Sequence, residues 1–152
     1  MNANPLLQAW DTPHGLPPFD LFRPEHFEPA LRHAMDVHRG EVAAISGQTA
    51  DPSFDNTLAA FDRAGQLLGR VAMAFYNLTS SATSPELQAV QREVAGPLAA
   101  HSSAVYQDAV LFARIDALYL QRTELGLNPE QQRLLERTHL AFVRSGARLP
   151  AA

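Results

Sequence analysis

Apolar residues recur along this chain at intervals of three and four, the spacing that places side chains on one face of a helix. This pattern predicts helices over about residues 24–45, 55–79, 84–105, 108–125 and 128–146. No segment alternates apolar and polar residues for long enough to indicate a strand, and short joints favour antiparallel neighbours. The sequence therefore predicts an all-α, up-and-down bundle of about five helices.

Capping residues mark the start of two of these predicted helices. Ser84 and Asn128 are good helix N-caps, and each is followed by a proline that suits the first helical position. Gln131 lies three residues after Asn128 and completes the pattern of a capping box. Within the third predicted helix, Gly96 and Pro97 predict a kink, because proline removes a backbone donor.

The first 23 residues lack a helical period and contain several prolines, which restrict the backbone. Large apolar side chains lie between these prolines, and their exposure to water would be unfavourable. We therefore predict an extended, ordered, Pro-rich N-terminal arm over residues 1–23, packed on the body, and a single helical domain over residues 24–149. The apolar arm residues are Trp10, Leu16, Phe19, Leu21 and Phe22.

Two leucines, Leu120 and Leu140, lie off the apolar stripes of their predicted helices. Isolated exposed leucines are ordinary on protein surfaces. The two could equally belong to a surface that docks on a structure absent from this chain. Exposed apolar surface of this kind would also suit a homodimer.

Composition narrows the possible functions. Hydrophobic residues make up 46% of the chain, enough for a packed core. The net charge is -4 and no run of basic residues occurs, which argues against a nucleic-acid partner. Cysteine is absent, which excludes disulfides, thiolate metal sites and cysteine nucleophiles. The chain shows no signal-peptide pattern and no apolar run long enough for a membrane span, so we expect a cytoplasmic protein with no membrane partner.

The six histidines are the first candidates for chemistry. His26 and His33 share a helix face but lie two turns apart, about 10 Å along the axis, too far for one zinc ion to bridge easily. His38 and Glu41 have a spacing found in some metal sites of helix bundles, but such a site needs ligands from other helices. A solvated surface pair is the simpler interpretation.

His101 and His139 fall on or beside apolar stripes, so we expect core residues with hydrogen-bonded nitrogens instead of catalytic groups. No serine lies in a nucleophile motif, the glycines are too scattered for a phosphate loop, and no HExxH sequence occurs. The sequence therefore predicts no catalytic, cofactor-binding or metal-binding residue in this chain.

Six stretches, read in order, are similar to one family of enzymes. Together they resemble the N-terminal region of the thimet oligopeptidase-like zinc metallopeptidases, in particular the oligopeptidase A and peptidyl-dipeptidase branch. The stretches are NPLL (4–7), GLPPFDLFRPEHFEPAL (15–31), PSFDNTLAAFDRAGQLLGRV (52–71), FYNLTSSATSPELQAVQREVAGPLAAH (75–101), LFARIDALY (111–119) and LNPEQQRLLERTHLAFVRSGARL (127–149).

The resemblance implies an almost entirely helical peptidase whose two lobes face each other across a deep channel that admits short peptides. In that family the zinc ligands, HExxH with a distal glutamate, lie far downstream of the region matched here. The resemblance thus implies a domain that forms a channel wall, restricts substrate size and is inactive alone. Zinc is expected only in the full-length enzyme. The expected partners are the remainder of the peptidase, with its catalytic lobe, and short peptides.

A stand-alone helical protein-interaction module from a truncated gene is the alternative. A reading frame that continues past Ala152 into an HExxH sequence would favour the peptidase, whereas a native stop codon would favour the module. The sequence does not distinguish endopeptidase from dipeptidyl carboxypeptidase activity.

Overall fold

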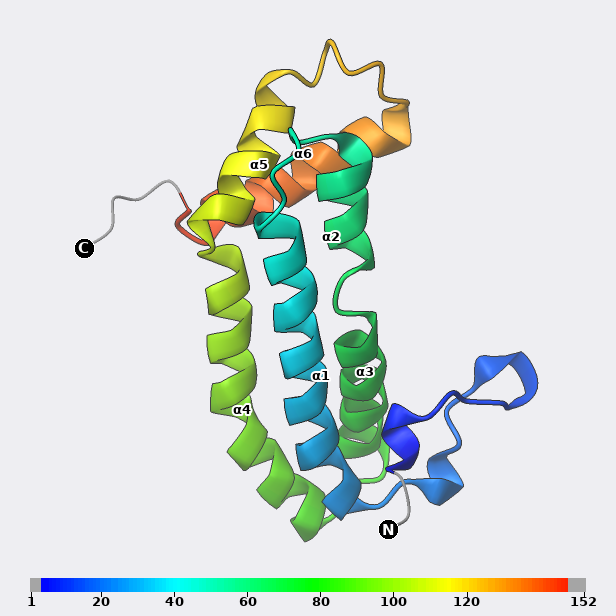
Figure 1. The fold of residues 1–152 in the computed structure, drawn as a ribbon. Coiled ribbons are helices and arrows are strands. Elements are labelled where there is room, and N and C mark those ends of the chain that lie inside the picture. Colours follow the sequence, from blue (N-terminus) through cyan, green and yellow to red (C-terminus); the bar gives the residue numbers. More distant parts are fainter. Residues whose placement is uncertain (1–3, 148–152) are drawn as a thin grey trace. The chain divides into compact units, whose positions relative to one another are not determined.

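The computed structural model describes residues 4–147 (Figure 1). The first three residues of the predicted arm and the last two of the predicted domain, 148 and 149, lie outside this range. Helices dominate the described residues and no strand occurs among them, so the predicted all-α fold with a Pro-rich N-terminal arm is confirmed. Within the same range no helix combines the length and apolar character needed to cross a membrane.

The described chain divides into two compact units, residues 4–38 with 65–99 and residues 39–64 with 100–147. The single domain expected over residues 24–149 stays a prediction. The first unit holds the beginning of α1 (Pro24–Ser46), all of α3 (Gln66–Ser81) and the beginning of α4 (Pro85–Tyr106).

Within the first unit, α3 runs antiparallel to the beginnings of α1 and α4 (Figure 1). The core of this unit is built around Phe27 and Phe75, which are fully buried and whose ring centroids lie 5.2 Å apart. Burial of a side chain of this size stabilises the folded state by about 1.5–3 kcal/mol. Other buried members of this core are Leu31, Val71, Ala74, Leu87 and Val94.

The N-terminal arm is fastened to the first unit by polar contacts as well as by apolar burial. The Asn4 side chain accepts a hydrogen bond from the Leu6 N–H at 3.0 Å and donates one to the His26 carbonyl at 2.7 Å. Arg70 donates to the Leu6 carbonyl at 3.3 Å, and its guanidinium carbon lies 4.8 Å from the centre of the Trp10 ring. The arm itself forms three short 3-10 turns, Pro5–Leu7, Pro13–Gly15 and Phe19–Leu21.

The large apolar side chains of the arm divide into two groups. Phe22 is buried and Trp10 is half-buried against the first unit, whereas Leu16, Phe19 and Leu21 are exposed. The apolar contacts of the arm with the rest of this unit therefore come from its first half, with Leu6, Leu7 and Trp10, and from Phe22 near its end.

The second unit contains the end of α1, a π-helical turn η4 (Phe54–Ala59), α2 (Ala60–Arg63), the end of α4, α5 (Ala109–Leu120) and α6 (Pro129–Arg144). Phe142 of α6 is fully buried at the centre of its core. Its ring centroid lies 5.6 Å from that of Phe61, 5.0 Å from that of Tyr106 and 6.0 Å from that of Phe112. Further buried members are Val42, Ile45, Leu58, Val105, Leu111, Ile115, Leu118 and Leu135.

The prediction of one helix over residues 55–79 was wrong, because the chain breaks between α2 and α3. Ala64 is extended, with ψ 148°, and Gly65 adopts the left-handed conformation, with φ 76°. Glycine favours this conformation because it lacks a Cβ. The break also brings the Gly65 backbone close to the ring of His38. The interruption therefore lies where the chain packs closely against a residue distant in sequence.

We expect Gly65→Ala to lower the free energy of unfolding by about 1–2 kcal/mol, because L-residues pay a steric cost in the left-handed region. A Cβ at this position would also lie 3.1 Å from two atoms of the His38 ring. Gly69→Ala in α3 is the matched control, since a Cβ there meets nothing within 4 Å. Alanine should stabilise that helical position by about 0.5–1 kcal/mol. Urea denaturation measures both, and equal stabilisation at the two positions would contradict this account.

The predicted helix starts are confirmed. Asn128 and Gln131 form a reciprocal capping box with Pro129 in the first turn of α6. The Ser84 side chain accepts a hydrogen bond from the Leu87 N–H at 3.2 Å at the start of α4. The pKa of the Glu86 carboxyl lies below its usual value. The main cause is a hydrogen bond with the Ser84 side chain, and the second is a hydrogen bond with the backbone.

The predicted end of the fourth helix was wrong, since α5 stops at Leu120 and not at residue 125. The Arg122 side chain folds back and donates to the Tyr119 carbonyl at 2.8 Å, which satisfies one of the carbonyls left open at a helix end. In α4, the helix continues through Pro97 to Tyr106, and the kink expected there stays a prediction.

Candidate functional site

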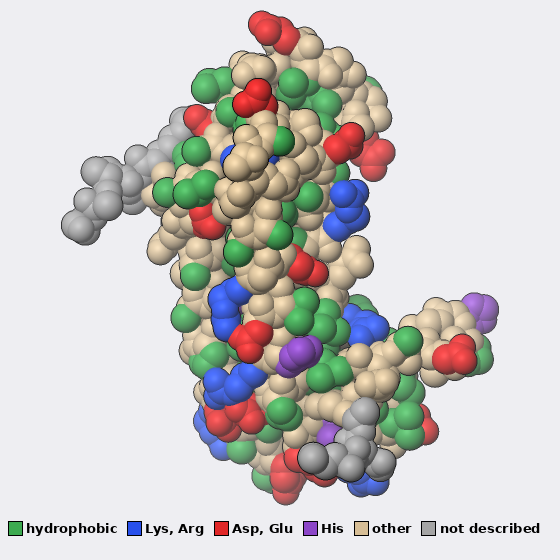
Figure 2. All heavy atoms as spheres, viewed as in Figure 1, with side chains coloured by type: hydrophobic (Ala, Val, Ile, Leu, Met, Phe, Trp, Pro, Cys, Tyr) green, Lys and Arg blue, Asp and Glu red, His purple; other side chains and the backbone are tan. Residues whose placement is uncertain are grey.

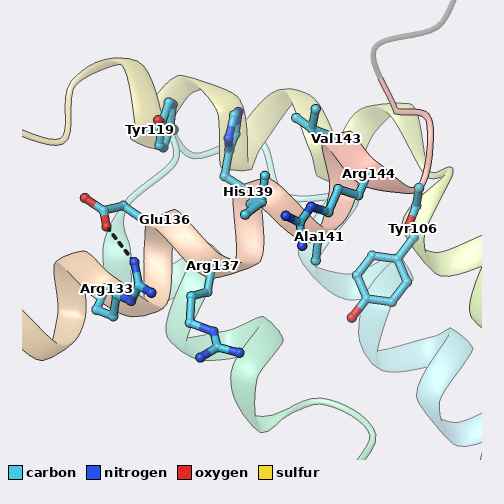
Figure 3. A pocket seen from close by; sticks show the side chains of 11 residues that line it. Tyr106, Tyr119, Arg133, Glu136, Arg137, His139, Ala141, Val143 and Arg144 are labelled. Atoms are coloured by element: carbon cyan, nitrogen blue, oxygen red, sulfur yellow. Dashed lines mark ion pairs between the residues drawn. The ribbon is translucent and has the colours of Figure 1, made fainter.

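An open hollow of about 970 Å³ lies along α6 in the second unit (Figure 3). Most of its lining comes from α6, and the end of α4 and α5 contribute Tyr106 and Tyr119. The side chains that can carry chemistry here are arginines, tyrosine and serine hydroxyls, one histidine and one glutamate.

Three arginines of the hollow, Arg133, Arg137 and Arg144, come from one side of α6. Their spacing of four and seven residues brings them to the same helix face. Arg133 forms an ion pair with Glu136 at 3.5 Å, drawn as a dashed line in Figure 3. Both side chains are partly exposed, so the pair contributes less than about 1 kcal/mol. Within residues 4–147, Arg137 and Arg144 have no ion pair within 4 Å.

The charged lining of the hollow is three arginines against one glutamate, although the chain as a whole carries a net charge of -4. On the face visible in Figure 2, basic and acidic side chains are interspersed and form no extended basic surface. The lining of the hollow is therefore more basic than the chain as a whole. Arginine recognises carboxylates and phosphates through paired N–H donors, so the arrangement is suited to holding an anionic group.

His139 also borders the hollow, but its ring is part of the core. Its side chain is buried, with 5% of the residue's surface exposed, and its Nε2 lies 2.8 Å from the Asp116 carboxylate. One ring face stacks on Tyr119, with centroids 3.8 Å apart, and Phe112 lies 5.7 Å away in a stacked arrangement. The expectation of a core histidine with a hydrogen-bonded nitrogen is confirmed.

Among residues 4–147, the remaining histidines do not assemble into a metal site. His101 is buried, as expected for a residue on an apolar stripe. His26 accepts a hydrogen bond at Nδ1 from the Arg23 N–H at 3.1 Å, near the start of α1. Across the part of the chain that the structure describes, no three His, Asp or Glu side chains lie close enough to share a metal ion, so His38 and Glu41 gain no third ligand.

Arg114 is a polar residue that sequence reasoning missed. It is buried within α5 and donates to the Thr57 hydroxyl at 3.2 Å and to the Asn56 side-chain oxygen at 3.1 Å. Its Nη1 donates to the carbonyls of Gln48 and Ala50 at 3.2 and 3.0 Å. The guanidinium therefore holds the loop after α1 and the turn η4 against α5. A lone arginine inside an otherwise apolar run was the available signal.

Comparisons with known proteins place these observations in context. No protein-family model matches the chain. The chain is 40% identical over 149 residues to the dipeptidyl carboxypeptidase of Salmonella typhimurium and 38% identical over 149 residues to that of Escherichia coli. It is also 30% identical over 148 residues to oligopeptidase A of Salmonella typhimurium. These alignments cover 97–98% of the chain but 21–22% of the relatives, so the chain spans about one fifth of their length.

Proposed function

Because the chain belongs to the peptidase family of the dipeptidyl carboxypeptidases and oligopeptidase A, as its sequence predicted, we propose that it is the N-terminal helical domain of a zinc-dependent oligopeptidase. In this role it forms part of the wall of a peptide channel, restricts the size of substrates and performs no chemistry by itself. The observation that carries the proposal is an alignment that covers almost all of this chain and only about one fifth of each peptidase.

The donor groups of the described chain do not fit a zinc site. Structural and catalytic zinc sites take at least three protein ligands, and no cluster of three His, Asp or Glu side chains occurs within residues 4–147. We therefore assign the metal to the remainder of the peptidase and derive no step of hydrolysis from the residues of this chain.

The hollow along α6 is the surface that we assign to the channel wall. Short peptides carry a carboxylate at one end and further carboxylates on acidic side chains. Arg137 and Arg144 have no ion pair within the described residues and can present their donors to such groups. The hollow would then retain peptides by charge, while the catalytic residues of the other lobe act on them.

A chimera tests this assignment. The matched segment of the Salmonella typhimurium dipeptidyl carboxypeptidase is replaced by this chain, and cleavage of a peptide that the parent enzyme accepts is measured. We expect Arg137→Gln with Arg144→Gln to raise KM about three- to tenfold with little change in kcat, because exposed charge pairs are worth about 0.2–1 kcal/mol each. A peptide of the same length without acidic side chains, which keeps the free C-terminus that a carboxypeptidase acts on, should lose part of this difference.

The matched control is Arg63→Gln with Arg92→Gln. Both of these arginines are exposed and lie outside the hollow, so the change in net charge is the same. An equal rise in KM for the two double variants would indicate a general charge effect and contradict the assignment of the hollow.

A further inference from the structure

Helix α5 has an unusual composition for a helix that faces water. Ten of its twelve residues are apolar, and Arg114 and Asp116 are its only charged residues. Both charged side chains are bound inside their own unit, Arg114 to the loop after α1 and Asp116 to His139 at 2.8 Å. Both charged side chains of α5 therefore have partners inside the unit, and the outer surface of the helix carries no charged side chain.

The apolar residues of α5 form two opposite stripes. At about 100° per residue, Arg114 and Asp116 fall on the two boundaries between these stripes. The inner stripe packs in the core of the second unit; it comprises the buried Leu111, Phe112, Ile115 and Leu118 and the half-buried Tyr119. The outer stripe comprises Ala109, Val110, Ala113, Ala117 and Leu120.

The outer stripe is open in the described chain. Val110 is 57% exposed and Leu120 is 68% exposed. A surface helix normally carries polar residues opposite its buried face, and a helix that is apolar all round is normally buried on all sides. Single exposed leucines need no explanation, but this stripe extends from the first turn of α5 to the last without a polar residue. The small residues Ala113 and Ala117 between the larger ones would let a second helix approach closely.

We propose that the outer stripe of α5 docks on an apolar helical surface in the remainder of the peptidase. This inference rests on the proposed function, since the chain corresponds to 22% of the dipeptidyl carboxypeptidase of Salmonella typhimurium and most of that polypeptide lies outside the matched segment. The absence of charge from the stripe favours an apolar partner, because the buried core of a protein interface is depleted in charged residues. The charged hollow along α6 and this apolar stripe are then two surfaces with different roles.

The test introduces two glutamates, Val110→Glu with Leu120→Glu, into the chimera and into the 152-residue chain. In the chimera we expect a clear fall in Tm and a loss of activity of about tenfold or more, because the interface would bury two unpaired charges. In the chain alone both positions are open to water, so its helix content and Tm should stay unchanged. Gln88→Glu with Gln91→Glu, at exposed positions of α4, is the control and should leave both proteins unaffected.

The two readouts separate this inference from the proposed function. The Tm of the chimera decides whether the stripe is buried, whereas the activity of the unmodified chimera decides whether the chain serves a peptidase. A chimera that keeps its Tm with both glutamates would overturn the inference. A chain that sediments as a dimer, and becomes a monomer only with the two glutamates while the chimera is unaffected, would assign the stripe to a second copy and also overturn it.

Discussion

Arg114→Met is expected to lower the free energy of unfolding by about 3 kcal/mol. The substitution keeps a side chain of similar length but removes every donor that now reaches Thr57, Asn56 and the carbonyls of Gln48 and Ala50. Leaving one buried acceptor without a partner costs about 1–3 kcal/mol, and some of these acceptors can turn to water. Urea denaturation measures the loss, and amide exchange should show faster opening of residues 48–57.

Two further variants test this explanation. Arg114→Lys keeps the charge but has fewer donors in a different geometry, so its loss should be intermediate. Arg63→Met changes an exposed arginine of the same unit and should alter stability by less than about 0.5 kcal/mol. A loss for Arg114→Met no larger than that for Arg63→Met would show that the buried guanidinium is not needed to hold the loop.

Phe142→Ala is expected to cost about 3–5 kcal/mol, which is typical when a buried aromatic side chain is replaced by alanine. Phe142 is fully buried, and its ring packs against those of Phe61, Tyr106 and Phe112. Leu140→Ala is the control on the same helix, because Leu140 is 45% exposed and should tolerate truncation with a loss below about 1 kcal/mol. Chemical denaturation of both variants measures the difference, and similar losses would contradict the assignment of Phe142 to the centre of this core.

Local signals in the sequence predicted much of the helical architecture. The capping box at Asn128 and Gln131 depends on residues three apart, and the structure forms it as expected. The interruption at Gly65 was missed because a glycine is tolerated inside many helices. Only the fold shows that Gly65 adopts a left-handed conformation beside His38.

The hollow along α6 could not be predicted from the sequence. The spacing of Arg133, Arg137 and Arg144 is visible in the sequence, but a charged helix face beside a hollow has the same pattern as an ordinary solvated face. The exposure of Leu120, by contrast, could be predicted, because it lies off the apolar stripe of its helix. Its membership in a continuous outer stripe could not be predicted, because only the structure shows that Arg114 bonds inside the unit and leaves the stripe without a charge.

The most direct test of the central claim compares the chain alone with the chimera in one peptide-cleavage assay, each with added zinc and with a chelator. We expect cleavage by the chimera, and its loss on adding the chelator or on deleting the matched segment. We expect no cleavage by the pure chain at any zinc concentration. Chelator-sensitive cleavage by the pure chain, or a folded chimera without activity, would contradict the proposal that this chain is the non-catalytic helical part of an oligopeptidase.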